Sequence, residues 1–274
     1  MITPEREGLI GELVQHYERH QGLYRRFLKA LHQQISDAID PDNDHRLALL
    51  VHSVKFRLKD PKHLRNKLIR HTKEEAEGKR VFDYTVENLF TRITDLAGYR
   101  ILHLHTRQMG ELNEHLIPLL EEAHKVVEGP KAKTWDDETR TYFESVHIET
   151  ENNQRMYSSV HYIVQPNSRT PVTMEIQVRT LADEIWGEVD HKINYPDPHE
   201  SLACREQIRA LARVTSSCSR LVDAIVASNA DWVAQNTAVV PSETVLAEST
   251  TVVAEAAAAA PSGDSGQSEP DGTD

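Results

Sequence analysis

One segment constrains the fold more than any other: residues 172–195, VTMEIQVRTLADEIWGEVDHKINY. Along residues 172–179, apolar and polar side chains alternate, which predicts a strand with one apolar and one polar face. From Leu181 onward, apolar residues recur every four positions, which predicts a helix with Thr180 as its N-cap. A strand running directly into a helix indicates a sheet with helices packed against it.

The polar face of this strand carries Glu175 and Gln177 side by side, next to the cationic Arg179. A carboxylate on a rigid strand is suited to hold a divalent cation or to take a proton from a hydroxyl. An edge strand with ordinary solvated polar residues has the same pattern. This strand alone therefore leaves both interpretations open.

Composition places the chain among soluble globular proteins. Of its 274 residues, 39% are hydrophobic and 27% are charged, and this length is ample for a buried core. No apolar run approaches the roughly 20 residues that a membrane span requires, and the N-terminal residues are polar, unlike a secretory signal. We therefore expect a cytoplasmic protein with no membrane partner.

The net charge of −12 is unevenly distributed. Residues 241–274 hold seven acidic side chains and no Lys or Arg, whereas residues 55–80 hold ten basic and four acidic ones. A local basic block in an acidic protein indicates an anionic ligand at one site rather than general nucleic-acid binding. A solvated basic helix face is the alternative.

Periodicity along the chain predicts an α+β (α/β) fold, with a mixed sheet of about five strands flanked by helices. Helical spacing covers residues 4–39 with a break near Gly22, 61–78, 109–127 and 200–235. Strand-like runs cover the second half of 47–58, then 93–104, 142–150, 157–165 and 172–179, and residues 131–141 have the polarity of a loop. We divide the chain into an N-terminal helical segment (1–45), a core (46–198), a C-terminal helix (199–236) and a disordered acidic tail (237–274).

Four groups of residues could carry chemistry. The first joins Arg57 and Lys59 to Lys67 across a helix that Pro61 would open, so that lysines and free N–H groups could hold phosphates. In the second, Asp95 precedes a glycine turn and a strand that contains an arginine able to stack on a base.

The third group places Tyr157 and His161 on one strand face, and the fourth is Glu175 with Gln177. Each group alone is more often plain surface than a site. Together in one sheet they supply two acids for Mg²⁺, several cations for phosphates and flat groups for bases, which fits phosphoryl transfer.

Two weaker patterns involve histidines. Glu188 and His191 have the ExxH spacing of di-iron helical bundles, and Glu184 lies one turn earlier, but a single such motif favours an ordinary helix face for all three. His103 and His105 point the same way on a strand, and two histidines do not complete a zinc site, so we favour a polar strand face.

At the four groups the sequence resembles the RelA/SpoT alarmone synthetase domain of small single-domain synthetases. RLKDPKHLRNK resembles that family's RxKxxxSxxxK, DLAGYR its DxxGxR, and MYSSVH its GYxSxH. MEIQVRT followed by WGEVDHKINY resembles EIQIRT…AExEHxxxY. The motifs stand in the family's order and cover residues 57–195, about half of the chain.

The resemblance implies a nucleotidyltransferase-like synthetase fold. It also implies transfer of pyrophosphate from ATP to the ribose 3′-OH of GDP or GTP, with Mg²⁺, giving AMP and the alarmone (p)ppGpp. By matching position, Arg57 and Arg100 would sandwich the adenine, and Lys59 and Lys67 would hold the donor phosphates. Asp95 would be a magnesium ligand.

On the acceptor side, the resemblance implies that Glu175 shares the metal or activates the 3′-hydroxyl, with Gln177 supporting it. Tyr157 would stack on the acceptor base, and His161 would bind phosphates. A stacked base is worth roughly 1–3 kcal/mol, so an aromatic ring alone does not select guanine.

Departures from the family pattern concentrate on the acceptor side. Met156 stands where the family has glycine, Pro196 where it commonly has lysine, and the lysines usual just upstream of Tyr157 are absent. His63 replaces the family's serine in the first motif. These departures leave two other functions open, modification of the tRNA 3′ CCA end by a toxin-type pyrophosphokinase and a non-catalytic nucleotide-binding regulator. The long terminal helices leave a homo-oligomer open as well.

Overall fold

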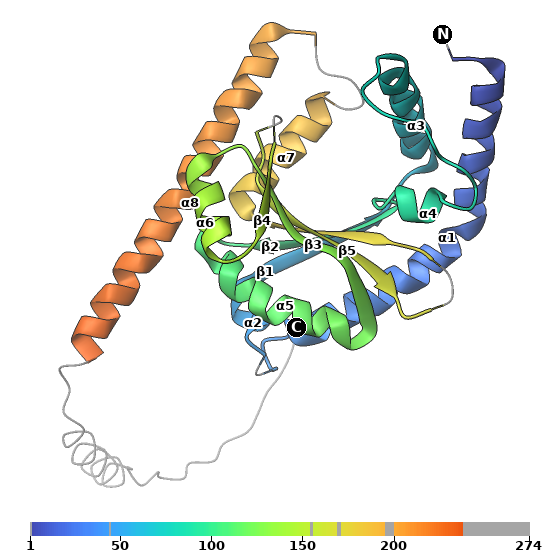
Figure 1. The fold of residues 1–274 in the computed structure, drawn as a ribbon. Coiled ribbons are helices and arrows are strands. Elements are labelled where there is room, and N and C mark those ends of the chain that lie inside the picture. The colour runs from blue at the N-terminus through green and yellow to red at the C-terminus, as the bar shows by residue number, and fades with distance from the viewer. Residues whose placement is uncertain (1, 44, 154–155, 169–170, 195–199, 238–274) are drawn as a thin grey trace, which may run out of the picture. The chain divides into compact units, whose positions relative to one another are not determined.

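The computed structural model describes residues 2–43, 45–153, 156–168, 171–194 and 200–237. Its centre is a mixed sheet of six strands in the order β1-β2-β6-β5-β3-β4, one strand more than the periodicity predicted (Figure 1). The strands are β1 (Val51–Leu58), β2 (Ala97–His103), β3 (His124–Thr134), β4 (Glu149–Asn152), β5 (Ser159–Pro166) and β6 (Met174–Thr180). The helices are α1 (Pro4–Ala38), α2 (Leu47–Leu50), α3 (Pro61–Ala76), α4 (Leu89–Arg92), η1 (Thr106–Gln108), α5 (Met109–Ala123), α6 (Asp137–Ser145), α7 (Leu181–Asn194) and α8 (Leu202–Thr237).

Residues 1–224 form one compact unit, which contains the whole sheet. Residues 225–274 form a second unit, in which only the helical residues 225–237 are described. Most of the predicted acidic tail lies outside the described residues, and the four domain boundaries expected from composition stay predictions. No helix in the described part of the chain is long and apolar enough to cross a membrane.

The two faces of the sheet have opposite character because side chains alternate along each strand. One face carries buried apolar residues such as Tyr99, Tyr162 and Ile176. Buried residues of α1 and α5 belong to the same core cluster. The other face carries Arg100, His161 and other polar residues in the alternate positions. In the view of Figure 1, α5 lies below the sheet and α7 above it.

The strand and helix expected at residues 172–195 are present as β6 and α7. Thr180 ends the strand, and its Oγ1 accepts a hydrogen bond of 3.1 Å from the backbone N–H of Asp183, as an N-cap does. β6 is an interior strand, paired with β2 on one side and β5 on the other, so the edge-strand alternative is wrong. The apolar spacing that located α7 does not mark its buried side, because Ile185 is 59% exposed whereas Trp186 is buried.

The expected break of the first helix at Gly22 is wrong, because α1 continues through it. A glycine inside a helix costs roughly 1 kcal/mol relative to alanine. Tyr17 and Tyr24 on either side are fully buried, together with Leu13, Leu31 and other residues of the same face. This packing along the helix outweighs the local cost of one glycine.

The region between α5 and β5 was also assigned incorrectly from periodicity. Residues 124–134, expected to be helix and loop, form β3, and residues 137–145, expected to be loop and strand, form α6. The alternation of β3 is broken by register shifts against β5 on either side of Glu128. Asp136 caps α6 by accepting a hydrogen bond of 3.0 Å from the N–H of Thr139.

Candidate active site

A row of polar residues crosses the sheet on the face opposite the main core. Strand pairing aligns Lys55 with Arg100, Arg100 with Gln177, Gln177 with His161, and His161 with Lys131. Directly paired residues project from the same face, so these five side chains from five strands lie in line. Arg57 and Glu175 stand one alternation further along the same face.

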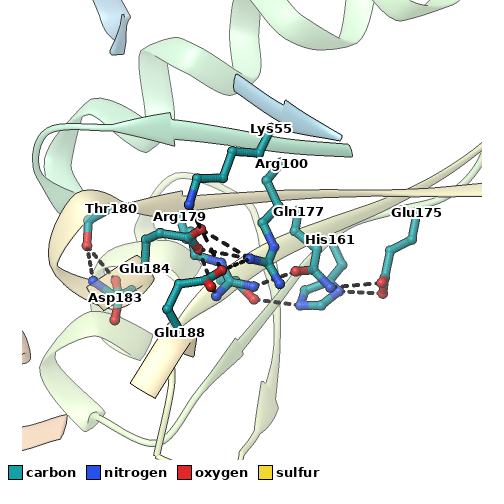
Figure 2. A network of polar contacts seen from close by, with 11 residues as sticks. Lys55, Arg100, His161, Glu175, Gln177, Arg179, Thr180, Asp183, Glu184 and Glu188 are labelled. Atoms are coloured by element: carbon teal, nitrogen blue, oxygen red, sulfur yellow. Dashed lines mark hydrogen bonds and ion pairs between the residues drawn. The ribbon is translucent and has the colours of Figure 1, made fainter. Parts of the chain in front are cut away.

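Glu175 is held by two neighbours in this row. Its Oε1 accepts a hydrogen bond of 2.8 Å from His161 Nδ1, and its Oε2 accepts one of 2.8 Å from Gln177 Nε2 (Figure 2). Burial favours the neutral acid, but the hydrogen bonds from His161 and Gln177 outweigh burial and lower the pKa of Glu175. The other ring nitrogen of His161 is 2.6 Å from Ser159 Oγ, which fixes the ring. Glu175 is therefore an oriented, ionised carboxylate.

Asp95, in the turn before β2, holds two lysines. Lys59 Nζ lies 2.8 Å from Oδ2 and Lys67 Nζ lies 2.7 Å from Oδ1. Burial alone would raise the pKa of Asp95, but the charges of Lys67 and Lys59 outweigh it and lower the pKa. The first two sequence groups thus meet at one carboxylate.

Tyr17 of α1 joins the two segments that carry this ion pair. Its hydroxyl lies 2.7 Å from the carbonyl oxygen of Lys59 and 3.1 Å from that of Leu96, the residue after Asp95. The backbone N–H of Lys59 also donates to the Leu96 carbonyl, at 2.9 Å. The N-terminal helix therefore supports the two segments that carry Lys59 and Asp95.

α7 adds two acids that the sequence analysis did not assign to the site. Glu184, whose side chain is only 7% exposed, contacts Lys55 Nζ at 2.9 Å, Arg100 Nη1 at 3.1 Å and Arg179 Nη1 at 3.4 Å (Figure 2). Glu188 contacts Arg100 Nη1 at 2.7 Å. Glu188 thus belongs to an ion-pair network on the helix face, as favoured from its spacing. These acids fix the guanidinium group of Arg100.

The histidine pair next to β2 is buried rather than part of a polar surface. His103 and His105 are 2% and 7% exposed, so the expected polar strand face is wrong. Burial lowers the pKa of His103 to about 4, which keeps the ring neutral. His105 Nδ1 lies 2.6 Å from Asp223 Oδ1 of α8.

Tyr157 precedes β5 and stacks on an aromatic residue of α7. Its ring centroid lies 5.9 Å from that of Trp186 with an interplanar angle of 20°, and 6.5 Å from the His161 ring. Asn153 Nδ2 donates a hydrogen bond of 3.0 Å to the Tyr157 carbonyl. The aromatic ring assigned to the acceptor thus lies beside the row that holds Glu175.

Two adjoining cavities of about 360 Å³ each open at these residues, and Arg57 and Asp95 line both. This volume falls within the roughly 300–1,000 Å³ of small-molecule sites. The first cavity is also lined by Lys55, Arg100, Glu175, Gln177 and Glu188. The second is also lined by Lys59, His63, Lys67, Arg70 and His191. All seven residues predicted for ATP binding and catalysis therefore line this cleft of two adjoining cavities.

The chemistry of the two carboxylates fits a hard divalent cation. Asp95 and Glu175 are both ionised and line the same cavity, where the charge of Asp95 acts on Glu175. No group of three or more His, Cys, Asp or Glu side chains suited to a metal occurs among the described residues. Mg²⁺ commonly takes one or two carboxylates and completes its shell with substrate phosphates and water. These two residues match that requirement.

Comparison with known proteins identifies the family. The sequence model described as a region found in RelA / SpoT proteins matches residues 56–200, more than half of the chain. The chain belongs to the RelA/SpoT family. No curated protein sequence matches it, but solved structures share its fold.

Small alarmone synthetase 1 from Bacillus subtilis has a TM-score of 0.56 at 18% identity, over 78% of this chain and 98% of that one. Its complex with its product pppGpp has a TM-score of 0.54 at 18% identity, over 77% and 97%. Its complex with AMPCPP has a TM-score of 0.53 at 18% identity, over 79% and 99%. The family and the fold expected from the four motifs are confirmed.

Several residues around this RelA/SpoT site escaped the sequence analysis. Lys131 was placed in a loop, and Tyr17 and Trp186 were treated as helix residues without a role. Glu184 was recognised only by its spacing from Glu188. The signal that was available for Glu184 and Glu188 is their i, i+4 spacing directly after a polar strand, which places both acids on one helix side.

Proposed function

We propose that this protein transfers pyrophosphate from ATP to the ribose 3′-hydroxyl of GDP or GTP, producing AMP and a (p)ppGpp-type alarmone. The observation that carries this proposal is one cleft lined by the ionised Asp95 and Glu175 and by the basic residues of α3 and β1. Membership of the RelA/SpoT family supports it, as does the fold shared with synthetases solved with pppGpp and AMPCPP.

The donor half of the cleft is suited to ATP. Arg57 and Arg100 line the same cavity, and planar guanidinium groups stack on flat bases such as adenine. Lys59 and Lys67 bind the donor phosphates. Phosphates compete with Asp95 for these two lysines, and their arrival therefore frees the Asp95 carboxylate to hold Mg²⁺. Mg²⁺ held there would neutralise charge on the donor phosphates.

The acceptor half orients the hydroxyl. In the reaction the 3′-oxygen bonds to the β-phosphorus of ATP, the bond from that phosphorus to the α–β bridging oxygen breaks, and AMP leaves. The hydroxyl proton must depart, and Glu175 is the acceptor that His161 and Gln177 hold in place. Because its pKa is lowered, Glu175 is a weak base and a good metal ligand, so positioning is its larger contribution. Tyr157 stacks on the acceptor base.

A second candidate is pyrophosphorylation of the tRNA 3′ end, and one contact favours it. Lys131, the cation next to His161 in the polar row, lies 3.5 Å from Glu149 and 3.6 Å from Glu151. These two acids compete with acceptor phosphates for Lys131. A tRNA 3′ end presents a hydroxyl without a 5′-polyphosphate and needs no such cation.

The test is incubation with γ-³²P-ATP and Mg²⁺ in parallel with GDP, GTP, GMP or bulk tRNA. Glu175→Ala should abolish transfer while nucleotide binding persists, and Glu121→Ala, an exposed acid on α5, should leave transfer unchanged. Label on GDP or GTP supports the alarmone function, and label on tRNA alone replaces it with the second candidate. Absence of transfer to every acceptor contradicts both and favours a nucleotide-binding regulator.

A further inference from the structure

A second apolar cluster lies beside the predicted acceptor tyrosine. Its buried members are Trp186 of α7 and Ile208 and Ala212 of α8. Met156 and Tyr157 pack against it, and so do Trp135 and Leu211. The indole N–H of Trp186 donates a hydrogen bond of 3.0 Å to the carbonyl of Ile208, which joins α7 to α8 at the centre of the cluster. α8 begins after residue 200, where the match to the RelA/SpoT family ends.

Met156 has a backbone conformation that its side chain disfavours. Its φ is +63°, in the left-handed region that glycine adopts freely and residues with a Cβ rarely do. The family motif has glycine at this position. Here the side chain packs against the Trp186 and Ile208 cluster, and this packing offsets the backbone cost. A side-chain contact, rather than glycine's freedom, therefore sets the conformation immediately before Tyr157.

The part of α8 that bears Ile208 and Ala212 is firmly held by the core. Asp136, which caps α6, accepts hydrogen bonds of 3.0 Å from Ser216 Oγ and 2.6 Å from Arg220 Nη1. One turn further on, Asp223 accepts from His105 Nδ1 at 2.6 Å and from the backbone N–H of Arg107 at 2.9 Å. These two acids tie the part of α8 up to Asp223 to the segments after β2 and β3, so this part of the helix is a firm support.

We propose that α8 is a working part of the acceptor site, in which Met156, Trp186 and Ile208 are positioning residues that preset the ring of Tyr157 for base stacking. The proposal rests on the proposed function, in which Tyr157 stacks on the acceptor base. Where the family motif has glycine, Met156 packs its side chain against a cluster that includes Ile208 and Ala212 of α8. The acceptor pays less ordering entropy when it binds a ring that is already in place.

A positioning role for this cluster can be distinguished from a purely structural role, because positioning Tyr157 affects only the acceptor substrate. The ATP-binding residues Arg57, Lys59, Lys67 and Arg100 lie on β1, α3 and β2 or between β1 and α3, and none of them belongs to this cluster. Weakening the cluster should therefore impair binding of the acceptor and leave binding of ATP unchanged. A general loss of folding would impair both.

The experiment compares Met156→Gly, Met156→Leu and Ile208→Ala with the wild-type full-length chain. The control is Val214→Ala, on the same helix at a side chain that is 64% exposed. We expect Met156→Gly and Ile208→Ala to raise KM for GDP by about three- to tenfold, a fraction of the effect of losing one base stack. KM for ATP should stay within about twofold, and Met156→Leu and Val214→Ala should resemble wild type. If wild type labels only tRNA, tRNA replaces GDP as the varied substrate.

Hydrogen exchange gives a readout that does not depend on activity. The backbone amides of Tyr157 and Ser158 should exchange faster in Met156→Gly and Ile208→Ala than in wild type or Val214→Ala. Unchanged acceptor KM with unchanged exchange overturns the proposal, and so does a parallel rise in both KM values. If wild type transfers nothing to any acceptor, the proposed function fails, and the exchange rates alone decide whether α8 holds the Tyr157 segment.

Discussion

Replacing Tyr17 by phenylalanine tests how α1 supports the donor site. The ring remains in place and leaves no cavity, so the change removes only the hydroxyl that bonds the carbonyls of Lys59 and Leu96 at 2.7 and 3.1 Å. The Leu96 carbonyl keeps its bond from the Lys59 N–H, whereas the Lys59 carbonyl loses its hydroxyl partner. Leaving one buried acceptor unsatisfied costs about 1–3 kcal/mol. Burial raises the pKa of Tyr17 to about 12, so the hydroxyl is a donor at any ordinary assay pH.

The matched control is Tyr24→Phe, about two turns further along α1. The Tyr24 hydroxyl is buried and has no hydrogen-bond partner among the described residues, so removing it should be neutral or stabilising. Urea unfolding of both variants measures the difference in free energy of unfolding. KM for ATP should rise in Tyr17→Phe alone, because Lys59 and Asp95 lose a shared support. Equal destabilisation by the two changes would refute this account of Tyr17.

Three further predictions address the sheet, α7 and pH. Gly129→Ala should lower the free energy of unfolding, measured with urea, by more than about 2 kcal/mol, because the φ of Gly129 is +99° and an added Cβ would lie 2.3 Å from the His161 carbonyl oxygen. Its control is Gly8→Ala, which has open space around the added Cβ and should be stabilising. Glu184→Ala should lower the free energy of unfolding by about 3–5 kcal/mol, because it leaves the buried Arg179 without its carboxylate partner. Glu188→Ala, at a side chain that is 57% exposed, should lower it by less than about 1 kcal/mol. Similar losses of stability in both variants would contradict the proposed ion-pair network. Burial raises the pKa of Asp183 from 3.8 to about 6, so between these values the native state binds a proton that the unfolded state lacks. Lowering the pH from 7 to 5 should therefore raise the stability of wild type relative to Asp183→Asn by about 1.3 kcal/mol, and a relative fall measured by thermal unfolding would contradict it.

The clustering of Lys59, Lys67 and Asp95 could be predicted from sequence because these residues lie in short local patterns. Lys59 and Lys67 flank a helix start marked by Asp60 and Pro61, and Asp60 Oδ1 accepts from the N–H of Lys62 at 2.7 Å. The change from strand-like to helical spacing between Arg179 and Leu181 located β6 and α7 in the same way. Where several candidate site residues lie on one strand, the pattern of that strand alone is sufficient to predict that they lie together.

The neighbours of these residues could not be predicted because they depend on strand order and register. That Lys131 lies beside His161 follows only from the pairing of β3 with β5, and β3 has no clean alternation because register shifts lie on either side of Glu128. The strand predicted across residues 142–150 rested on alternation alone, and Asp136, which caps α6, was not considered. Tyr17 contacts carbonyl oxygens 42 and 79 residues away, and no local pattern encodes such contacts.

The same contrast explains why departures from a family motif need the structure before they are judged. From sequence, methionine in place of the motif glycine at residue 156 suggests a degraded acceptor site. In the fold, its backbone keeps the left-handed conformation and its side chain packs with Trp186 and Ile208. Residue 156 lacks the backbone freedom of glycine, but its side chain packs against a cluster that includes residues of α8, a helix outside the motif. In contrast, Lys131, the cation paired with His161, is held by Glu149 and Glu151. Acceptor-phosphate binding, rather than base stacking, is therefore where this chain should differ from its relatives.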